Sequence, residues 1–280
     1  MGKIIALTNQ KGGVGKSTIS FNMSTFLAEK YHKRVLVIDL DTQGNISHTL
    51  IRGSDEDGAI YDVLDLSGLQ TKNLYESDLD INALPPMKAT HGIDLVCTQT
   101  NDYSLADSVY QQTADGEVSG SEGMNAFVRN VQALAVNYDF VIIDCPPFLG
   151  DHVLSALLVC DYVITPVQPT AFGFDGVKGF FDNLVKIGRP EIFLGIVLNN
   201  VDKSWVRHVA MAQQLKESLE DKVFDCLLFH RGPYDSSVYM NRPLYSQIAW
   251  RTAATEFDDF LKEVIARINA IENSNITLEE

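Results

Sequence analysis

The sequence contains no paired cysteines, no long apolar run and no overall excess of basic residues. An iron–sulfur site needs clustered cysteines, and a membrane-spanning helix needs about 20 consecutive apolar residues. Neither feature is present, and no secretory signal precedes the first apolar run, at 4–8. We expect a cytoplasmic protein whose cysteines are buried free thiols in a reducing compartment. The cysteines are Cys97, Cys145, Cys160 and Cys226.

Acidic charge is unevenly distributed along the chain. The net charge is −15, but residues 54–122 contain 14 acidic residues against two basic ones, whereas residues 186–251 contain nine basic residues against seven acidic ones. We interpret the acidic segment 54–122 as a surface excursion that serves solubility or a partner. The overall acidity does not exclude nucleic-acid binding, because a basic patch can lie elsewhere on the surface.

Short apolar runs alternate with helical patterns along most of the chain. Buried parallel strands are short and rich in Val, Ile and Leu, whereas amphipathic helices repeat apolar residues every three or four positions. Strands are predicted at 4–8, 35–39, 140–143, 162–167, 192–198 and 223–229. Helices are predicted at 16–30, 123–136, 152–159, 174–187, 204–220 and 253–271. The alternation predicts an α/β fold, with a mostly parallel twisted sheet and helices on both faces.

The segment between 51 and 122 has a weaker pattern, which predicts a short helix at 60–65, a strand near 93–97 and a helix near 102–110. Motifs that belong to one nucleotide site lie on both sides of it. We therefore expect residues 1–280 to form a single domain, with no helix-turn-helix domain before the first strand.

The most informative motif, Asn9–Thr18, lies between the first predicted strand and the first predicted helix. Strand, glycine-rich turn and helix are the context of the phosphate-binding loop, in which backbone N–H groups and the helix N-terminus surround phosphate oxygens. Lys16 can reach the β- and γ-phosphates, and the Ser17 hydroxyl can bind Mg²⁺. The alternative is a β–α turn without a ligand, but this motif rarely arises by chance in this setting. The predicted nucleotide-binding residues are Lys11, Gly12, Gly13, Val14, Gly15, Lys16, Ser17 and Thr18.

Aspartates follow two of the predicted strands. Asp39 and Asp41 lie at the end of the second run, and Asp144 closes the third. A parallel sheet brings the carboxyl ends of its strands to one edge, where α/β folds bind ligands. Two carboxylates, a hydroxyl and phosphate oxygens suit Mg²⁺, so Ser17, Asp41 and Asp144 are the predicted metal site. A lone Asp at a strand end is often a turn residue, but the neighbouring loop favours the metal site.

Lys11 adds a second lysine to the loop, and Lys11–Thr18 resembles the deviant Walker A motif of the ParA/MinD ATPases. Asn9-Gln10 in front of it is similar to the ParA side of the family. Asp39–Asn45 resembles the ParA switch segment, with Thr42 where the family usually has proline, and Val141–Pro147 resembles the Walker B strand end. Looser similarity is present at Pro166–Gly176 and Asn241–Leu244.

This resemblance implies a Mg²⁺-dependent ATPase that forms a homodimer with ATP. In the family, the residue corresponding to Lys11 reaches the partner's phosphates and stabilises the transition state, as an arginine finger does. Asp41 helps to position the attacking water, and Asp144 holds the water shell of the metal. Asn199 follows a predicted strand and corresponds to an adenine-binding position. The alternatives are that Asn199 is an ordinary turn residue or that Asn200 takes this role.

The resemblance also implies partners, namely non-specific DNA and a ParB-type adaptor that stimulates hydrolysis during partition of a plasmid, chromosome or other cargo on the nucleoid. Contacts to DNA phosphates are sequence-independent and depend on salt. Solvated surface charge is the alternative for each basic side chain. The candidates are Lys203, Arg207, Arg231, Arg242 and Arg251.

A MinD-like or other ParA-like ATPase that acts on a membrane surface or a protein scaffold is the alternative function. Membrane attachment would need a helix with a basic polar face. The polar side of the last predicted helix, 253–271, is acidic instead. We therefore expect this helix to pack on the core and the protein to have no stable membrane association.

Overall fold

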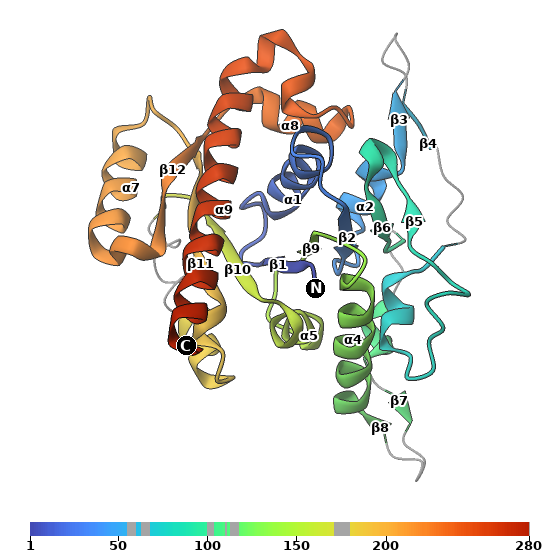
Figure 1. The fold of residues 1–280 in the computed structure, drawn as a ribbon. Coiled ribbons are helices and arrows are strands. Elements are labelled where there is room, and N and C mark those ends of the chain that lie inside the picture. Colours follow the sequence, from blue (N-terminus) through green and yellow to red (C-terminus); the bar gives the residue numbers. More distant parts are fainter. Residues whose placement is uncertain are drawn as a thin grey trace.

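One sheet runs through the whole molecule (Figure 1). The computed structural model describes residues 1–54, 60–62, 68–99, 104–109, 111–112, 118–170 and 180–279. The strand order is β12-β11-β10-β1-β9-β2-β6-β5, and every neighbouring pair is parallel except the edge pair β5 and β6. The strands are β1 (Lys3–Leu7), β2 (Val35–Asp39), β5 (Met87–Lys88), β6 (Asp94–Val96), β9 (Phe140–Asp144), β10 (Tyr162–Val167), β11 (Phe193–Val201) and β12 (Val223–Phe229).

Helices cover both faces of this sheet. They are α1 (Lys16–Thr25), α2 (Asn45–Leu50), α3 (Ser104–Ser108), α4 (Gly120–Ala135), α5 (Asp151–Val159), α7 (Val206–Leu219), α8 (Gly232–Tyr239) and α9 (Arg251–Glu279), together with helical residues 180–186. A π-helical turn, η1 (Phe26–Lys30), continues α1, and short 3-10 turns occupy Thr71–Tyr75, Thr90–Gly92, Pro190–Ile192, Glu220–Lys222, Leu244–Ser246 and Ile248–Trp250. Two small hairpins pair β3 (Arg52–Ser54) with β4 (Ile60–Asp62) and β7 (Gln111–Gln112) with β8 (Val118–Ser119).

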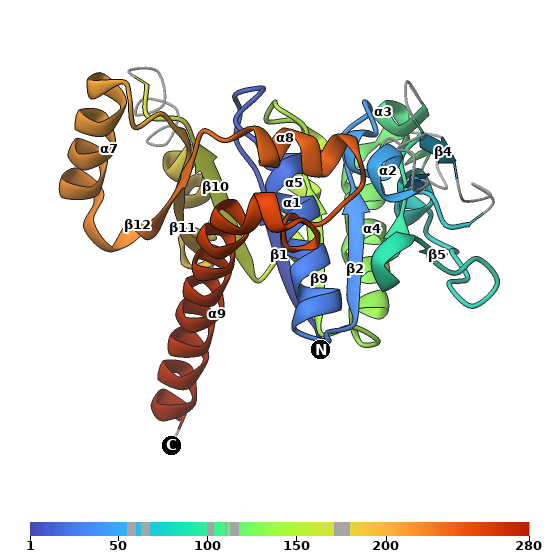
Figure 2. The same ribbon diagram turned by 90° about the horizontal axis from the view of Figure 1, so that it is seen from above.

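Alternate side chains of the central strands point to opposite faces of the sheet and enter different cores. On β1, Ile5 and Leu7 join the core beneath α1 and α9, whereas Ile4 and Ala6 join the core beneath α4 and α5. A smaller apolar cluster lies under α7, at the β12 end of the sheet. Figure 2 shows α7 and α9 at this end and α4 with β5 at the other. The central strands are thus buried on both sides, as their continuous apolar runs indicate.

The structure confirms the predicted fold class and every strand predicted by an apolar run. The strand near 93–97 is β6, and the helix near 102–110 contains α3. The helix predicted at 174–187 is confirmed from 180 onward, while residues 174–179 lie outside the described residues.

Two expectations about the acidic segment are wrong. A helix was predicted at 60–65, but Ile60–Asp62 form β4, because they pair with the strand Arg52–Ser54; residues 63–65 lie outside the described residues. The segment is also more than a surface excursion. Its strand β6 pairs with β2, and Leu74 and Tyr75 are completely buried. The high content of acidic residues made the segment look like a surface loop, although its apolar residues belong to the core.

The last helix packs on the core, as expected from its acidic polar side. Its apolar residues Phe257, Phe260, Leu261 and Val264 are buried against the sheet, next to β12. Among the described residues, no helix combines the length and the apolar character that crossing a membrane requires.

Candidate functional site

The loop between β1 and α1 has the backbone conformation of a phosphate-binding turn. Gly13 and Gly15 have φ values of 73° and 94°, in the left-handed region that favours glycine. At Gly15 a second constraint applies, because a Cβ atom there would lie 2.2 Å from Nδ2 of Asn199. Glycine at this position therefore allows both the turn and the close approach of β11. The loop ends at Lys16, the first residue of α1.

Side chains from two neighbouring strands hold this loop in place. Asn9 Nδ2 donates a hydrogen bond to the carbonyl oxygen of Pro166, at 2.7 Å, and Gln168 Nε2 donates to the carbonyl oxygen of Gly13, at 2.9 Å. From β11, the next strand, Asn199 Nδ2 donates to the carbonyl oxygen of Val14, at 2.8 Å. The loop is thus attached to the carboxyl ends of β10 and β11.

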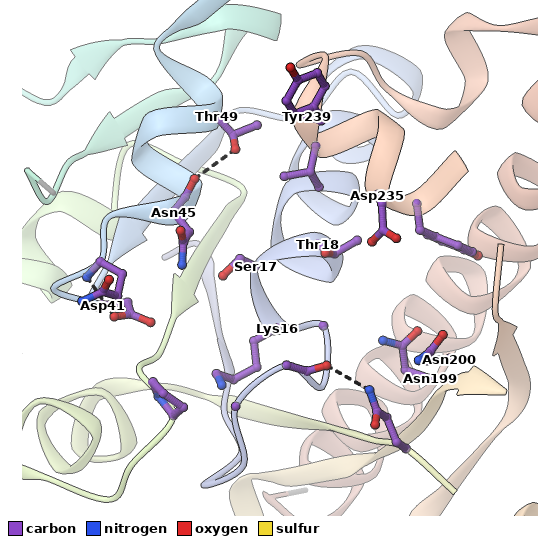
Figure 3. A pocket seen from close by; sticks show the side chains of 18 of the residues that line it. Lys16, Ser17, Thr18, Asp41, Asn45, Thr49, Asn199, Asn200, Asp235 and Tyr239 are labelled. Carbon is purple, nitrogen blue, oxygen red and sulfur yellow. Dashed lines mark hydrogen bonds between the residues drawn. The ribbon is translucent and has the colours of Figure 1, made fainter. Parts of the chain in front are cut away.

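An open cleft of about 700 Å³ lies above the loop. In Figure 3, Lys16, Ser17 and Thr18 form its floor, α2 lies on one side and α8 on the other. The predicted Asp41 and Asn199 both line this cleft, where residues from six separate parts of the sequence meet.

Two helices that sequence analysis did not predict supply the walls of the cleft. The wall residues are Asn45, His48, Thr49 and Arg52 on α2 and its end, and Tyr234, Asp235, Val238 and Tyr239 on α8. A signal was present for α2, because Asn45, His48 and Thr49 are spaced as one face of a helix. Both helices are short, and isolated helices of this length are marginal, so their sequences predict them poorly.

The two lysines of the loop have different environments. Lys16 is buried, with 7% of its surface exposed, and its Nζ lies 3.5 Å from the carbonyl oxygen of Lys11. Burial lowers the pKa of Lys16, while the carboxylates of Asp144 and Asp41 partly oppose this shift. Lys11 is exposed and does not line the cleft. One cation therefore lies inside the site, and the other is exposed to solvent.

Asp39 organises the segment that carries Asp41. Its carboxylate is completely buried and accepts hydrogen bonds from the backbone N–H of Asp41, at 3.0 Å, and from the N–H and hydroxyl of Ser47, at 3.0 and 2.7 Å. The hydroxyls of Thr71 and Thr98 donate to its carbonyl oxygen. Asp39 therefore connects the position of Asp41 to the end of β6.

Asp144 lies under the loop, next to Ser17 and Ser20. Burial raises the pKa of Asp144, and the hydroxyl groups of Ser17 and Ser20 oppose this rise. The Ser20 hydroxyl donates to Oδ1 at 2.9 Å, but Oδ2 has no hydrogen-bond partner among the described residues. A buried carboxylate oxygen without a partner suits the water shell of a cation. With the nearby carboxylate of Asp41, these oxygen ligands fit Mg²⁺.

Five basic residues were predicted to contact DNA, and the structure distributes them over several segments. Lys203 Nζ lies 3.7 Å from the centre of the Phe229 ring, and the Arg231 guanidinium lies 5.8 Å from the same centre. Arg231 also forms an ion pair with Glu256, at 3.2 Å. Arg207 is exposed on α7, Arg242 is half-buried after α8, and Arg251 begins α9. Lys203 and Arg231 share a contact, the Phe229 ring.

This combination of a parallel sheet, a glycine-rich loop that leads into a helix, and carboxylates at neighbouring strand ends defines a P-loop nucleoside triphosphatase. A family model described as an AAA domain matches residues 2–192. The chain belongs to this family, within the ParA/MinD group of P-loop ATPases.

Individual relatives are similar over nearly the whole chain. The sporulation initiation inhibitor protein Soj of Bacillus subtilis is 29% identical over 272 residues, which cover 95% of this chain and 99% of that protein. The chromosome partitioning protein ParA of Caulobacter vibrioides is 28% identical over 273 residues, with 95% and 94% covered. The structure of apo McdA from Cyanothece superposes with a TM-score of 0.75 at 17% identity, covering 95% of this chain and 100% of that one. The last similarity concerns the fold alone.

Proposed function

We propose that this chain is an ATPase that hydrolyses ATP to ADP and phosphate with Mg²⁺ and dimerises when ATP is bound. In this proposal the dimer binds DNA without sequence preference and drives partition or positioning of a plasmid, chromosome or other cargo. A ParB-type adaptor stimulates hydrolysis. The observation that carries the proposal is the contrast between the two loop lysines, Lys16 in the cleft and Lys11 exposed at its edge.

The chemistry depends on positioning and charge stabilisation, as in other phosphoryl transfers. Lys16 and the backbone N–H groups of the loop bind the β- and γ-phosphates. Ser17, Asp41 and Asp144 would hold Mg²⁺, which would supply positive charge to neutralise the developing phosphate charge. Asp41 also orients the attacking water, and its backbone hydrogen bond to Asp39 keeps it in place.

A second copy of the chain completes the site. Lys11 can contact the phosphates of the partner only if the two loops face each other. Only a triphosphate has the γ-phosphate that would attract Lys11 across the interface, so the dimer should depend on ATP. Apolar side chains are exposed on loops at the same edge of the sheet. Phe148 and Leu149 follow β9, with 52% and 43% exposed, and Trp205 follows β11, with 52% exposed. Burying such residues favours association.

The test compares wild type, Lys11→Ala and Asp41→Ala by light scattering and by DNA binding, with ATP, with ADP and without nucleotide. Wild type should dimerise and bind duplex DNA only with ATP, and Asp41→Ala should accumulate the ATP dimer because hydrolysis is slowed. Lys11→Ala should remain a monomer. A dimer that is independent of nucleotide, or wild-type turnover by Asp41→Ala, would contradict the proposal.

A ParA-like ATPase that acts on a protein scaffold is the second candidate. Two observations favour it: the net charge of −15, and the ion pair that occupies Arg231, one of the candidate DNA contacts. If the Asp41→Ala dimer forms with ATP but binds no DNA even at low salt, the scaffold function is the better account. Localisation on the nucleoid is part of the DNA proposal and is lost with it.

A further inference from the structure

The α2 side and the α8 side of the cleft are connected by one asparagine. Asn241 follows α8, and its buried side chain donates through Nδ2 to the carbonyl oxygen of Arg52, just after α2. The same Nδ2 lies 2.9 Å from the hydroxyl of Thr90. Because Arg52 itself lines the cleft, the position of Asn241 fixes the two walls relative to each other.

A histidine in turn holds this asparagine. His91 belongs to the short turn Thr90–Gly92, between β5 and β6, and its Nε2 lies 3.1 Å from both the carbonyl oxygen and Oδ1 of Asn241. Its Nδ1 lies 2.8 Å from Oε1 of Glu29, in η1. The ring also packs against Phe21 of α1, with centroids 6.1 Å apart. Three segments that are distant in the sequence thus meet at one imidazole ring.

Both ring nitrogens of His91 face oxygen atoms that accept hydrogen bonds. Nδ2 of Asn241 is already used by Arg52 and Thr90, so Oδ1 is the amide atom that faces the ring. A backbone carbonyl, an amide oxygen and the ionised carboxylate of Glu29 have no proton to donate. The doubly protonated ring therefore satisfies both sides, whereas the neutral ring has one N–H and must give up one of the two contacts.

The titratable neighbours of His91 are Glu29 and, through that carboxylate, Tyr245 of the turn Leu244–Ser246. The Tyr245 hydroxyl lies 2.6 Å from Oε2 of Glu29, and burial together with this carboxylate raises the pKa of Tyr245. The remaining neighbours are the Phe21 ring and the amide of Asn241, which do not titrate. Of the described groups in these contacts, the imidazole is the one whose ordinary pKa lies near neutrality.

We propose that His91, bound as an imidazolium between Glu29 and Asn241, is a positioning residue that fixes the α8 wall and makes nucleotide affinity fall as the pH rises through neutrality. This inference rests on the proposed nucleotide binding. Asn241 closely follows Val238 and Tyr239, which line the cleft. When the ring loses a proton, one of its two contacts is lost. The nucleotide must then order a wall that was previously fixed, which weakens its binding.

The experiment measures the affinity of the full chain for ADP by calorimetry with Mg²⁺ at about pH 6 and about pH 8, where an ordinary imidazole is mostly protonated and mostly neutral. ADP and the cleft residues His48 and His230 also titrate, so each variant is compared with wild type at the same pH. At the lower pH, wild type should bind ADP about three- to tenfold more tightly than His91→Gln, the factor that one hydrogen bond supplies. At the higher pH the two should bind equally.

Further variants separate the charge of His91 from its structural role. His91→Lys keeps a cation with several donors at both pH values, so it should bind ADP more tightly than wild type at the higher pH. Asn241→Gly tolerates the left-handed backbone of that position, where φ is 47°, but disconnects the walls, so it should weaken binding at both pH values.

The matched control is His32→Gln. His32 is exposed after η1 and has a φ of 53°, close to the 60° of His91, so the substitution has a similar backbone cost away from Asn241. This variant should follow wild type at both pH values. If the ratio of wild-type to His91→Gln affinity is the same at both pH values, or if His91→Lys shows the full pH dependence of wild type, the inference alone is wrong. Failure of wild type to bind ADP at either pH would instead overturn the proposed function.

Discussion

Asp39 and Asp144 occupy paired positions on the neighbouring parallel strands β2 and β9, and both side chains are completely buried. Burial raises the pKa of each carboxyl, and the charge of Asp144 raises the pKa of Asp39 further. Two acidic groups are therefore held side by side in a place that disfavours their charge. In the proposed site, the positive charges of Mg²⁺ and Lys16 would offset the cost of burying these two carboxylates. Without the metal, the buried carboxylates should lower the stability of the fold.

The pH dependence of the free energy of unfolding should show the cost of burying Asp144. A carboxyl with a raised pKa binds protons on folding, so its contribution to stability is greatest below about pH 4 and falls as the pH rises. Asp144→Asn does not titrate. In urea unfolding with EDTA, the free energy of unfolding of the variant should rise relative to that of wild type from pH 5 to pH 8, by about 1–2 kcal/mol, because burial raises the pKa of Asp144 to about 6 and about one unit of this shift lies above pH 5.

Asp139 provides a control of the opposite sign. Its pKa is lowered by hydrogen bonds from Arg34, so its contribution to stability is complete above the ordinary Asp pKa of about 4 and is lost as the pH falls below that value. Asp139→Asn should therefore lose stability relative to wild type as the pH rises from about 2 to about 5, and show no further change from about pH 5 to about pH 8. If Asp144→Asn and Asp139→Asn show the same direction of pH dependence, the account of the buried pair is wrong.

Ser47→Ala should reduce turnover more than nucleotide affinity. The Ser47 hydroxyl donates to Asp39 and accepts from the backbone N–H of Thr98, at 2.9 Å. Its removal leaves a buried N–H without a partner, at a cost of about 1–3 kcal/mol, and loosens the segment that holds Asp41. Steady-state kinetics should show a lower kcat with little change in ADP affinity. The matched control is Ser24→Ala, since the Ser24 hydroxyl donates to the Ser20 carbonyl within α1; it should leave kcat unchanged.

Lys16→Ala and Lys11→Ala should separate binding from assembly. Lys16 is the buried side-chain cation of the loop, so its removal should weaken ADP binding by about 10- to 100-fold, as expected for hydrogen bonds to a charged group. Lys11 is exposed, so Lys11→Ala should bind ADP within about twofold of wild type. Calorimetry measures both values. Similar losses in the two variants would remove the distinction between the lysines.

Arg207→Glu should weaken DNA binding by the ATP-bound dimer equally for all sequences. A side chain that binds a DNA phosphate releases counterions, so the slope of log affinity against log salt should become shallower by about one for each phosphate that is no longer neutralised. Lys33→Glu is the charge-matched control, because Lys33 is exposed next to the amino end of β2. Mobility shifts at several salt concentrations give the slopes. Equal effects of the two variants would indicate that only net charge matters, and no effect of either would exclude Arg207 as a DNA-binding residue.

The sequence predicts the central sheet well because each strand is buried on both faces and its apolar run is continuous. It also predicts the loop and the aspartates at the strand ends, since their chemistry depends on local spacing. It does not predict α2 and α8, which are too short to have a strong periodic signal. The group of Glu29, His91 and Asn241 was also missed as a unit, because its residues meet only when η1, the turn Thr90–Gly92 and the end of α8 are adjacent. Non-local pairing of this kind leaves no pattern along the chain.

The hydrogen bonds of Asn9, Gln168 and Asn199 have a consequence for the kinetics of nucleotide binding. All three are contacts within the protein, so they favour the turned shape of the loop whether or not an anion is bound, and nucleotide binding should not require a slow rearrangement of the loop. The association rate should then rise in proportion to nucleotide concentration without reaching a plateau, and the heat capacity change should be small. Asn199→Ala would release one of these attachments, and a plateau should then appear as closure of the loop becomes the slow step.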